Sequence, residues 1–249
     1  MIGSAVACAL VERGVRDVAV VDVDLAGRCA SSELNAGGAR ATWWQEVNVA
    51  ACRDSLAFFA QNAEALSFRR CGYLWLYADA RLFARARERR ALQQRLGVRV
   101  DLLDPEELAR RFPVVDRNRA ELVGATFSPG DGLLNPNALR RLYQERALAG
   151  GARFLNRHLV EGVELTARAG GLREVTAVQL VELAKGDPAD DGRAVERILT
   201  GHSAPDEAVV EHLSFRPRWL VNALGAWSPL LAARLGVPSP ARPVRRQIA

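Results

Sequence analysis

Lysine is nearly absent from this chain. Lys185 is the single lysine among 34 basic residues, so arginine supplies almost all of the positive charge behind the net charge of +5. No block of five or six like charges occurs, and the most basic stretch, FARARERRALQQR, alternates arginine with apolar residues, as a solvated helix face does. We therefore expect no nucleic-acid partner despite the basic composition.

Cysteine and histidine are also scarce. The four cysteines form no C-x-x-C pair, and the three histidines lie far apart. This spacing gives neither a disulfide framework nor a zinc pattern, which predicts no metal site and a reducing, cytoplasmic location. No apolar run approaches the roughly 20 residues of a membrane helix, so no membrane span is expected. The apolar N-terminus lacks the basic region and cleavage site of a signal peptide.

An amphipathic run and a strand-like run open the chain. MIGSAVACALVERG predicts a helix over residues 2–13 that ends at Gly14, and VAVVDVD predicts a short, buried parallel strand. Gly3 stands where the third glycine of a dinucleotide-binding turn opens its helix, and Asp22 follows about twenty residues later, where an acid binds the ribose. The plainer alternative is a helix-initiating glycine before an ordinary strand.

Helices and strands alternate along the rest of the chain. We expect helices over 43–66, 80–96 and 105–112, a strand in RCGYLWLYAD, and a strand, turn, helix and strand over 124–155. Asp104 and Asn135 are expected helix N-caps. EVTAVQLVEL, AVERILTG and AVVEHLSF predict an antiparallel meander, and RWLVNALGAWSPLLAARLGV predicts a strand, a tight turn and a helix. The order indicates a mixed α/β fold.

Three stretches together resemble the FAD-dependent amine and amino-acid oxidoreductases, the D-amino-acid oxidase-like family that includes sarcosine oxidase, glycine oxidase and dimethylglycine dehydrogenase. They are GRCASSELNAGGARATW, GDGLLNPNALRRLYQERALAGGARFL and WLVNALGAWSPLLAARLGVPSPARPVRRQ. The second is similar to the family's D-G-x-x-x-P-x-x-L helix, and the third to its strand–NAxGxW–helix. SSELNAGG, FRRCGYLWL and NALGAWSPLLAARLGV are similar to a mitochondrial member linked to complex I assembly.

The resemblance implies an α/β protein whose Rossmann-like FAD-binding domain lacks its first strand and whose antiparallel substrate-binding sheet is incomplete. It divides the chain into 1–70, the first part of the FAD-binding domain; 71–128, the first part of the substrate domain; 129–236, the second part of the FAD-binding domain with the meander inserted at 166–217; and 237–249, the start of a truncated substrate domain. Because the first strand and two glycines would precede Met1, we expect this chain alone to bind FAD poorly.

FAD is the implied cofactor, held without a covalent bond. Gly3 would open the phosphate-binding helix, and Asp22 would bind the ribose. The backbone of Val160 would meet the adenine, and Ser31 and Ser32 would lie on the pyrophosphate side. The residues implied near the flavin are Asn35, Ala36, Gly37 and Gly38. The late turn, whose backbone amides would approach the flavin dinucleotide, consists of Ala223, Leu224, Gly225, Ala226 and Trp227. Leu224 stands where the family usually has Ala or Thr, and core packing is the alternative role of Trp227.

Arg40, Trp43 and Trp44 follow the flavin loop and are candidate substrate residues. An arginine there would hold a substrate carboxylate by two hydrogen bonds, although an ordinary surface ion pair remains an alternative. Tyr73 is another candidate pocket wall or a plain sheet residue.

The implied reaction oxidises a C–N bond of a small amine or amino acid by hydride transfer to the flavin, and water then hydrolyses the imine. It demands no protein general base, so no catalytic residue is assigned, and the electron acceptor stays open. The alternatives are a non-catalytic flavoprotein-like assembly factor and an inactive fragment.

Overall fold

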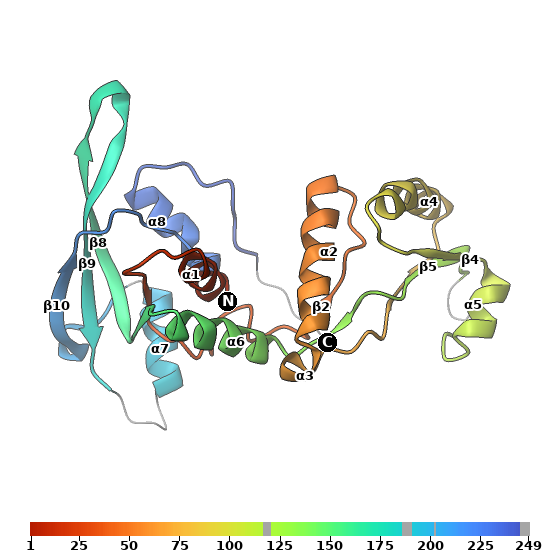
Figure 1. The fold of residues 1–249 in the computed structure, drawn as a ribbon, viewed down its shortest axis with the longest axis horizontal. Coiled ribbons are helices and arrows are strands. Elements are labelled where there is room, and N and C mark those ends of the chain that lie inside the picture. Colours follow the sequence, from red (N-terminus) through yellow and green to blue (C-terminus); the bar gives the residue numbers. More distant parts are fainter. Residues whose placement is uncertain (117–120, 186–190, 202, 245–249) are drawn as a thin grey trace. The chain divides into compact units, whose positions relative to one another are not determined.

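The computed structural model describes residues 1–116, 121–185, 191–201 and 203–244. The chain forms two compact units, one of residues Met1–Asn35 with Arg140–Ala249 and one of Ala36–Leu139. Both contain helices and strands, so the fold is the predicted mixed α/β one (Figure 1). The functional names given above to the four parts of the chain stay predictions.

The first unit holds most of the elements expected to bind a nucleotide. Its helices are α1 (Ile2–Glu12), the C-terminal part of α6 (Pro136–Ala149), α7 (Asp191–Gly201) and α8 (Ser228–Arg234). Its strands are β1 (Ala19–Asp22), β7 (Arg153–Asn156), β8 (His158–Ala167), β9 (Arg173–Leu183) and β10 (Val209–Phe215). Three short 3₁₀ turns complete the unit, at Ala169–Gly171, Asp206–Ala208 and Gly225–Trp227.

Helix α1 and strand β1 form as the sequence predicts. Gly14 follows the helix with φ +80°, the left-handed conformation that a glycine terminator adopts. β1 pairs in parallel with β7, and small residues let α1 and α6 pack closely against this pair. The shared core consists of Ala7, Cys8, Ala147 and Ala152. β1 is less buried than predicted, because β7 is its only ladder partner among the described residues.

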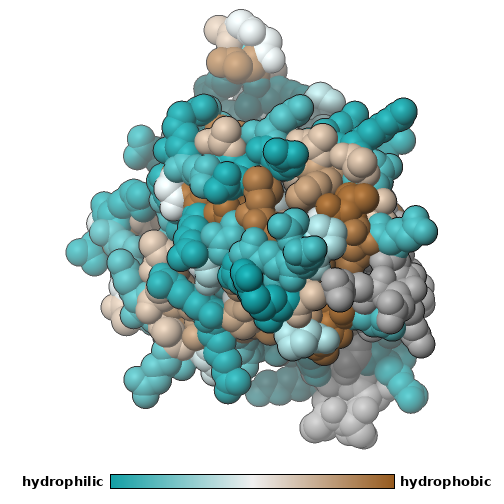
Figure 2. Space-filling view, turned by 90° about the vertical axis from the view of Figure 1, so that its right-hand side faces the viewer, coloured by the Kyte–Doolittle hydropathy of each residue, from teal (hydrophilic) through white to brown (hydrophobic). Residues whose placement is uncertain are grey.

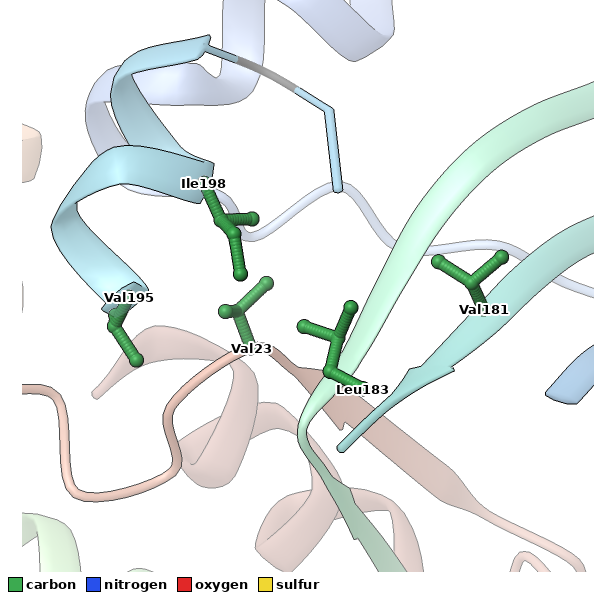
Figure 3. Packing of buried hydrophobic residues seen from close by; sticks show 5 residues of the cluster. All are labelled: Val23, Val181, Leu183, Val195 and Ile198. Carbon is green, nitrogen blue, oxygen red and sulfur yellow. The ribbon is translucent and has the colours of Figure 1, made fainter. Parts of the chain in front are cut away.

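A second core lies where β1 ends. Val23, directly after β1, belongs to one buried cluster with Val181 and Leu183 of β9 and with Val195 and Ile198 of α7 (Figure 3). AVERILTG was predicted as a strand, and that prediction was wrong. Its apolar residues at positions 195, 198 and 199 follow the helical spacing of three and four residues, which places them on one face of α7.

The predicted meander over 166–217 is correct in part. β8, β9 and β10 form an antiparallel sheet in the order β10-β9-β8, but β8 begins earlier, at His158, and α7 interrupts the connection from β9 to β10. The strand predicted in RWLVNALGAW does not form. Among the described residues this segment has no ladder partner, and two of its large apolar side chains stay exposed, with 82% of Trp219 and 55% of Val221 accessible.

The second unit contains two small antiparallel sheets and the helices that cover them. Its helices are α2 (Glu46–Gln61), α3 (Ala63–Leu66), α4 (Ala80–Arg95), α5 (Pro105–Arg111) and the first turn of α6. Its strands are β2 (Gly38–Ala39), β3 (Tyr73–Tyr77), β4 (Asp101–Leu103), β5 (Gly124–Ser128) and β6 (Gly132–Leu133). β2 pairs with β6, and the other sheet has the order β3-β5-β4.

Capping side chains fix the starts of α5 and α6 in this unit. Asp104 Oδ1 accepts the N–H of Glu107 at 2.7 Å, and Asn135 Oδ1 accepts those of Asn137 and Ala138, so both predicted N-caps are confirmed. The helix predicted from Trp43 begins later, at Glu46, and a break at Asn62 separates α2 from α3. The tryptophans that precede α2 are therefore in a loop.

No side chains of the described residues gather into a metal site: no group of three or more His, Cys, Asp or Glu occurs there. None of the described helices has the length and apolar character needed to cross a bilayer. All four cysteines are free thiols, and the reducing compartment expected from them stays a prediction. The face in Figure 2 is mostly hydrophilic with small hydrophobic areas between the polar groups.

Candidate functional site

The N-terminus of α1 presents backbone amides without a side-chain cap. Among the described residues no side chain accepts a hydrogen bond from its first turn, and uncapped helix amides bind anions such as phosphate. A Cβ on Gly3 would lie 3.6 Å from Ala223 Cβ and 3.9 Å from Val20 Cγ1. These are ordinary contacts, so packing alone does not demand glycine here. The structure does bring Gly3 and the late turn together.

Asp22 ends β1 beside this helix terminus. Its Oδ1 accepts the N–H of Asp24 at 3.0 Å, and the residue as a whole keeps solvent-accessible surface although protein packs around its carboxyl. The protein packed around the carboxyl raises its pKa, and the charge of Asp24 adds to that rise, while the Asp24 amide opposes it. An exposed acid at the carboxyl end of a parallel strand is where a dinucleotide fold binds the ribose hydroxyls. The position therefore matches the predicted role, which remains a prediction.

The loop after β1 is fixed by a buried carboxylate that sequence reasoning missed. Asp24 is 6% exposed and accepts hydrogen bonds from the backbone N–H groups of Ala26 and Arg28 and from the Arg28 guanidinium. Burial opposes its charge, but the Arg28 hydrogen bonds outweigh it and hold the pKa of Asp24 below its ordinary value. The second acid in DVDLAGR, Asp24, is the sequence feature that could have identified this buried carboxylate.

A second buried ion pair ties this loop to α6. Arg140 Nε donates to Glu33 Oε1 at 2.6 Å, and the two side chains are only 12% and 9% exposed. Arg140 Nη1 also donates to the carbonyl of Leu25, which accepts a further hydrogen bond from Gln144. Residues 25–33 are thus held to α6 by side chains more than a hundred positions away, and no local pattern predicts that.

Ser31, Ser32 and Asn35 lie in the same loop. Asn35 Nδ2 donates to the carbonyls of Ser32 at 2.6 Å and Ser31 at 3.4 Å. Ser31 is exposed and Ser32 is half-buried. The amide of Asn35 therefore stabilises the loop, and the cofactor roles of all three residues stay predictions.

Two later segments of the first unit also carry candidate residues. Asn222 Oδ1 accepts the N–H of Leu224, and its Nδ2 donates to the carbonyl of Ser228. Gly225 has φ +55° with open space on its Cβ side, which leaves room for a ligand beside the turn. Trp227 Nε1 donates to the carbonyl of Leu199 at 2.8 Å, a contact within the protein's own packing.

The expected adenine contact is at a strand irregularity. The ladder between β8 and β9 shifts register between Val160 and Gly162, and the carbonyl of Val160 accepts a hydrogen bond from Arg234 at 3.1 Å. An adenine amine bound at this carbonyl would have to share it with Arg234. The adenine role of Val160 stays a prediction.

The remaining candidates belong to the second unit, beginning with Ala36, which is exposed. Gly37 has φ +75°, and a Cβ there would lie 2.0 Å from the carbonyl oxygen of Leu134. A Cβ on Gly38 would lie 2.9 Å from the hydroxyl of Tyr73. The protein's own packing thus explains both glycines, and their predicted approach to a flavin is a separate, untested expectation.

The rings of Trp43, Tyr73 and Trp75 lie close to the guanidinium of Arg40. We call these four residues the Arg40 cage. The Arg40 guanidinium carbon is 4.4 Å from the ring centre of Trp43, 4.6 Å from that of Trp75 and 5.8 Å from that of Tyr73. Stacking of this kind holds a guanidinium while leaving its N–H groups at the edge free to bind. Among the described residues none accepts a hydrogen bond from Arg40 or forms an ion pair with it.

The structure separates one predicted substrate residue from this cage. Trp44 is 52% exposed, contacts the ring of Trp43 at 5.6 Å and lies under the guanidinium of Arg89 instead of Arg40. Trp75, which sequence reasoning missed, takes the second stacking position. The alternation of Tyr73 and Trp75 on one face of β3 was the signal that would have found it.

The first unit fits the ADP part of a dinucleotide. Uncapped amides at the start of α1 face no competing side chain among the described residues, an exposed acid ends the neighbouring strand, and open space borders Gly225. Nucleotide-binding α/β proteins share these features.

The family model described as FAD dependent oxidoreductase (DAO) matches residues 1–249, and the chain belongs to this family. The predicted family, its cofactor FAD and the α/β fold are thereby confirmed.

Individual relatives agree with this assignment. The chain is 26% identical over 238 residues to FAD-dependent oxidoreductase domain-containing protein 1 of Xenopus laevis, covering 90% of this chain and 43% of the relative. Two solved structures share the fold. L-proline dehydrogenase from P. horikoshii has a TM-score of 0.70 at 22% identity, over 94% of this chain and 53% of that one. Glycine oxidase from Geobacillus kaustophilus has a TM-score of 0.66 at 19% identity, over 94% and 55%. The chain thus spans about half the length of these relatives.

Proposed function

We propose that the protein oxidises a C–N bond of a small amine or amino acid. Membership of the FAD-dependent oxidoreductase family supports an oxidoreductase. The solved relatives named above carry the names of two amino acids, proline and glycine, which supports an amino acid or a related amine as substrate.

FAD would be held by the residues of the first unit. The amides at the start of α1 bind the diphosphate, and Asp22 accepts hydrogen bonds from the ribose. The ion pairs of Asp24 with Arg28 and of Glu33 with Arg140 keep the intervening loop in one conformation. When bound, FAD supplies the acceptor for the two electrons released on oxidation.

The proposed substrate class rests on the surroundings of the Arg40 guanidinium. A guanidinium stacked between Trp43 and Trp75, without an acceptor among the described residues, offers a planar pair of N–H donors to a carboxylate. The aromatic rings exclude water from the faces of the guanidinium, which strengthens its attraction for an anion at the edge. Arg40 would therefore orient an amino acid through its carboxylate.

The test is anaerobic reduction of FAD added in excess, because the chain alone is expected to bind FAD poorly. The reduction is monitored as loss of the absorbance of the oxidised flavin. Amino acids are compared with the amines that lack only the carboxylate. We expect an amino acid to reduce the flavin, and Arg40→Ala to raise the concentration it needs about 10- to 100-fold, the loss expected for one charge-assisted contact of about 1.5–3 kcal/mol.

The matched control is Arg89→Ala, which removes another guanidinium stacked on a tryptophan and should leave the amino-acid concentration unchanged. Protein with bound FAD that no amine or amino acid reduces would contradict the proposed function and favour the non-catalytic alternative. Reduction that is unaffected by Arg40→Ala would contradict only the role of Arg40.

A further inference from the structure

Asp131, the acid of the GDGLLNP stretch, is a fully buried carboxyl to which neither the sequence nor the proposed reaction gives a role. It is 0% exposed and lies between β5 and β6. Its Oδ1 accepts the N–H of Ala41 at 3.0 Å, across 90 positions of sequence. Its own carbonyl accepts the N–H of Gly72 at 2.9 Å. One residue thus joins three segments of the second unit.

Such a carboxyl is costly to bury. Its second oxygen, Oδ2, and the neighbouring hydroxyl of Ser128 make no hydrogen bond with a described residue. Burial raises the pKa of Asp131, against the opposing effects, in decreasing order, of the Ala41 amide, the Ser128 hydroxyl, the Arg40 charge and the Thr42 hydroxyl. An apolar residue of similar size would avoid this cost but could not accept the N–H of Ala41.

The segment that Asp131 holds carries the Arg40 cage. Ala41 is itself 0% exposed, and its neighbours on both sides contact tryptophans. The carbonyl of Arg40 accepts a hydrogen bond from Trp43 Nε1, and Thr42 Oγ1 accepts one from Trp75 Nε1, both at 3.3 Å. The N–H of Trp43 bonds to the carbonyl of Ala41 at 2.8 Å. A shift of the Ala41 backbone would therefore move Arg40 relative to both of its stacking partners.

We propose that Asp131 is a positioning residue, which holds the backbone of Ala41 so that the Arg40 guanidinium stays between Trp43 and Trp75. The consequence for substrate binding rests on the proposed function, but the positioning itself does not. An acceptor is needed at Oδ1, and a negative charge is not. Asparagine, which keeps an oxygen there and adds N–H donors that can reach Ser128, should therefore replace Asp131.

The first test uses near-ultraviolet circular dichroism without substrate or cofactor. The difference between the wild type and Arg40→Ala isolates the signal of the Arg40 cage. Asp131→Ala is expected to lose the same part of the spectrum, and adding Arg40→Ala to it should remove nothing more. Asp131→Asn should retain the signal, as should Asp54→Ala, which removes an exposed acid of the same unit. An Asp131→Ala variant that keeps the signal, or an Asp131→Asn variant that loses it, would overturn the proposal.

Hydrogen exchange at the Ala41 amide provides a second test that does not require Asp131→Ala to fold. The amide should be protected in the wild type and in Asp131→Asn, and should exchange about tenfold faster in Asp131→Ala if that variant folds, as expected for one lost hydrogen bond. An Ala41 amide that exchanges in the folded wild type at the rate of an unprotected amide contradicts the proposal, whatever the activity of the protein.

Discussion

Gly37→Ala is expected to destabilise the unit Ala36–Leu139 by about 3 kcal/mol. The left-handed conformation at φ +75° costs an L-residue about 1–2 kcal/mol. The new Cβ would also lie 2.0 Å from the Leu134 carbonyl oxygen, far closer than van der Waals contact. Because this oxygen belongs to the backbone, the backbone would have to move to relieve the clash. That oxygen belongs to the segment joining β6 to α6, and the N–H of Leu134 bonds to the carbonyl of Gly37. The measurement is the free energy of unfolding in urea.

Gly14→Ala is the matched control. Gly14 has φ +80°, but no atom lies within 4 Å of the position its Cβ would take. The control therefore measures the conformational cost alone, about 1–2 kcal/mol. Equal losses in the two variants would mean that the backbone yields to the Cβ at Gly37 and that close packing does not explain this glycine.

Arg140→Ala is expected to cost about 3 kcal/mol in the free energy of unfolding of the other unit. It leaves the carboxylate of Glu33 buried without its partner, at 9% exposure, and removes a donor from the carbonyl of Leu25. Because these contacts hold residues 25–33, the same variant should increase hydrogen exchange in that loop. Urea denaturation and exchange measured on one sample test both effects.

The neighbouring Arg141 supplies the control. It is exposed on the same helix, and Arg141→Ala should change the free energy of unfolding by no more than about 0.5 kcal/mol. A loss below about 1 kcal/mol for Arg140→Ala would indicate that the ion pair with Glu33 is solvated and does not fix the loop.

The local elements were predictable because their signals are local. The helix that ends at Gly14, the parallel strand before Asp22 and the caps Asp104 and Asn135 each depend on residues within a few positions. α7 was mistaken for a strand because β-branched Val195 and Ile198 favour strands, while the burial of one face, which decides the matter, comes from Val23 and β9. The short apolar run alone was ambiguous.

The contacts that shape the candidate site were not predictable from local pattern. Glu33 and Arg140 are 107 positions apart, and Ala41 and Asp131 are 90 apart. The sequence suggested Arg40 with Trp43 because they are adjacent in the chain, but Trp75 reaches Arg40 only through the fold of β3. Trp44 was grouped with them on proximity, and its ring contacts both Trp43 and the guanidinium of Arg89. Sequence proximity thus identified Trp43 as a partner of Arg40 but not Trp75.

The central claim is that the start of α1 and Asp22 bind the ADP part of FAD. The most direct measurement is a titration with ADP that is monitored by the NMR chemical shifts of the backbone amides. This readout also detects weak binding. We predict shifts at Gly3, Ser4 and Asp22 that disappear in Asp22→Ala and remain in Asp17→Asn, an exposed acid before the other end of β1. The account is contradicted if millimolar ADP shifts none of these amides, or shifts them equally in Asp22→Ala.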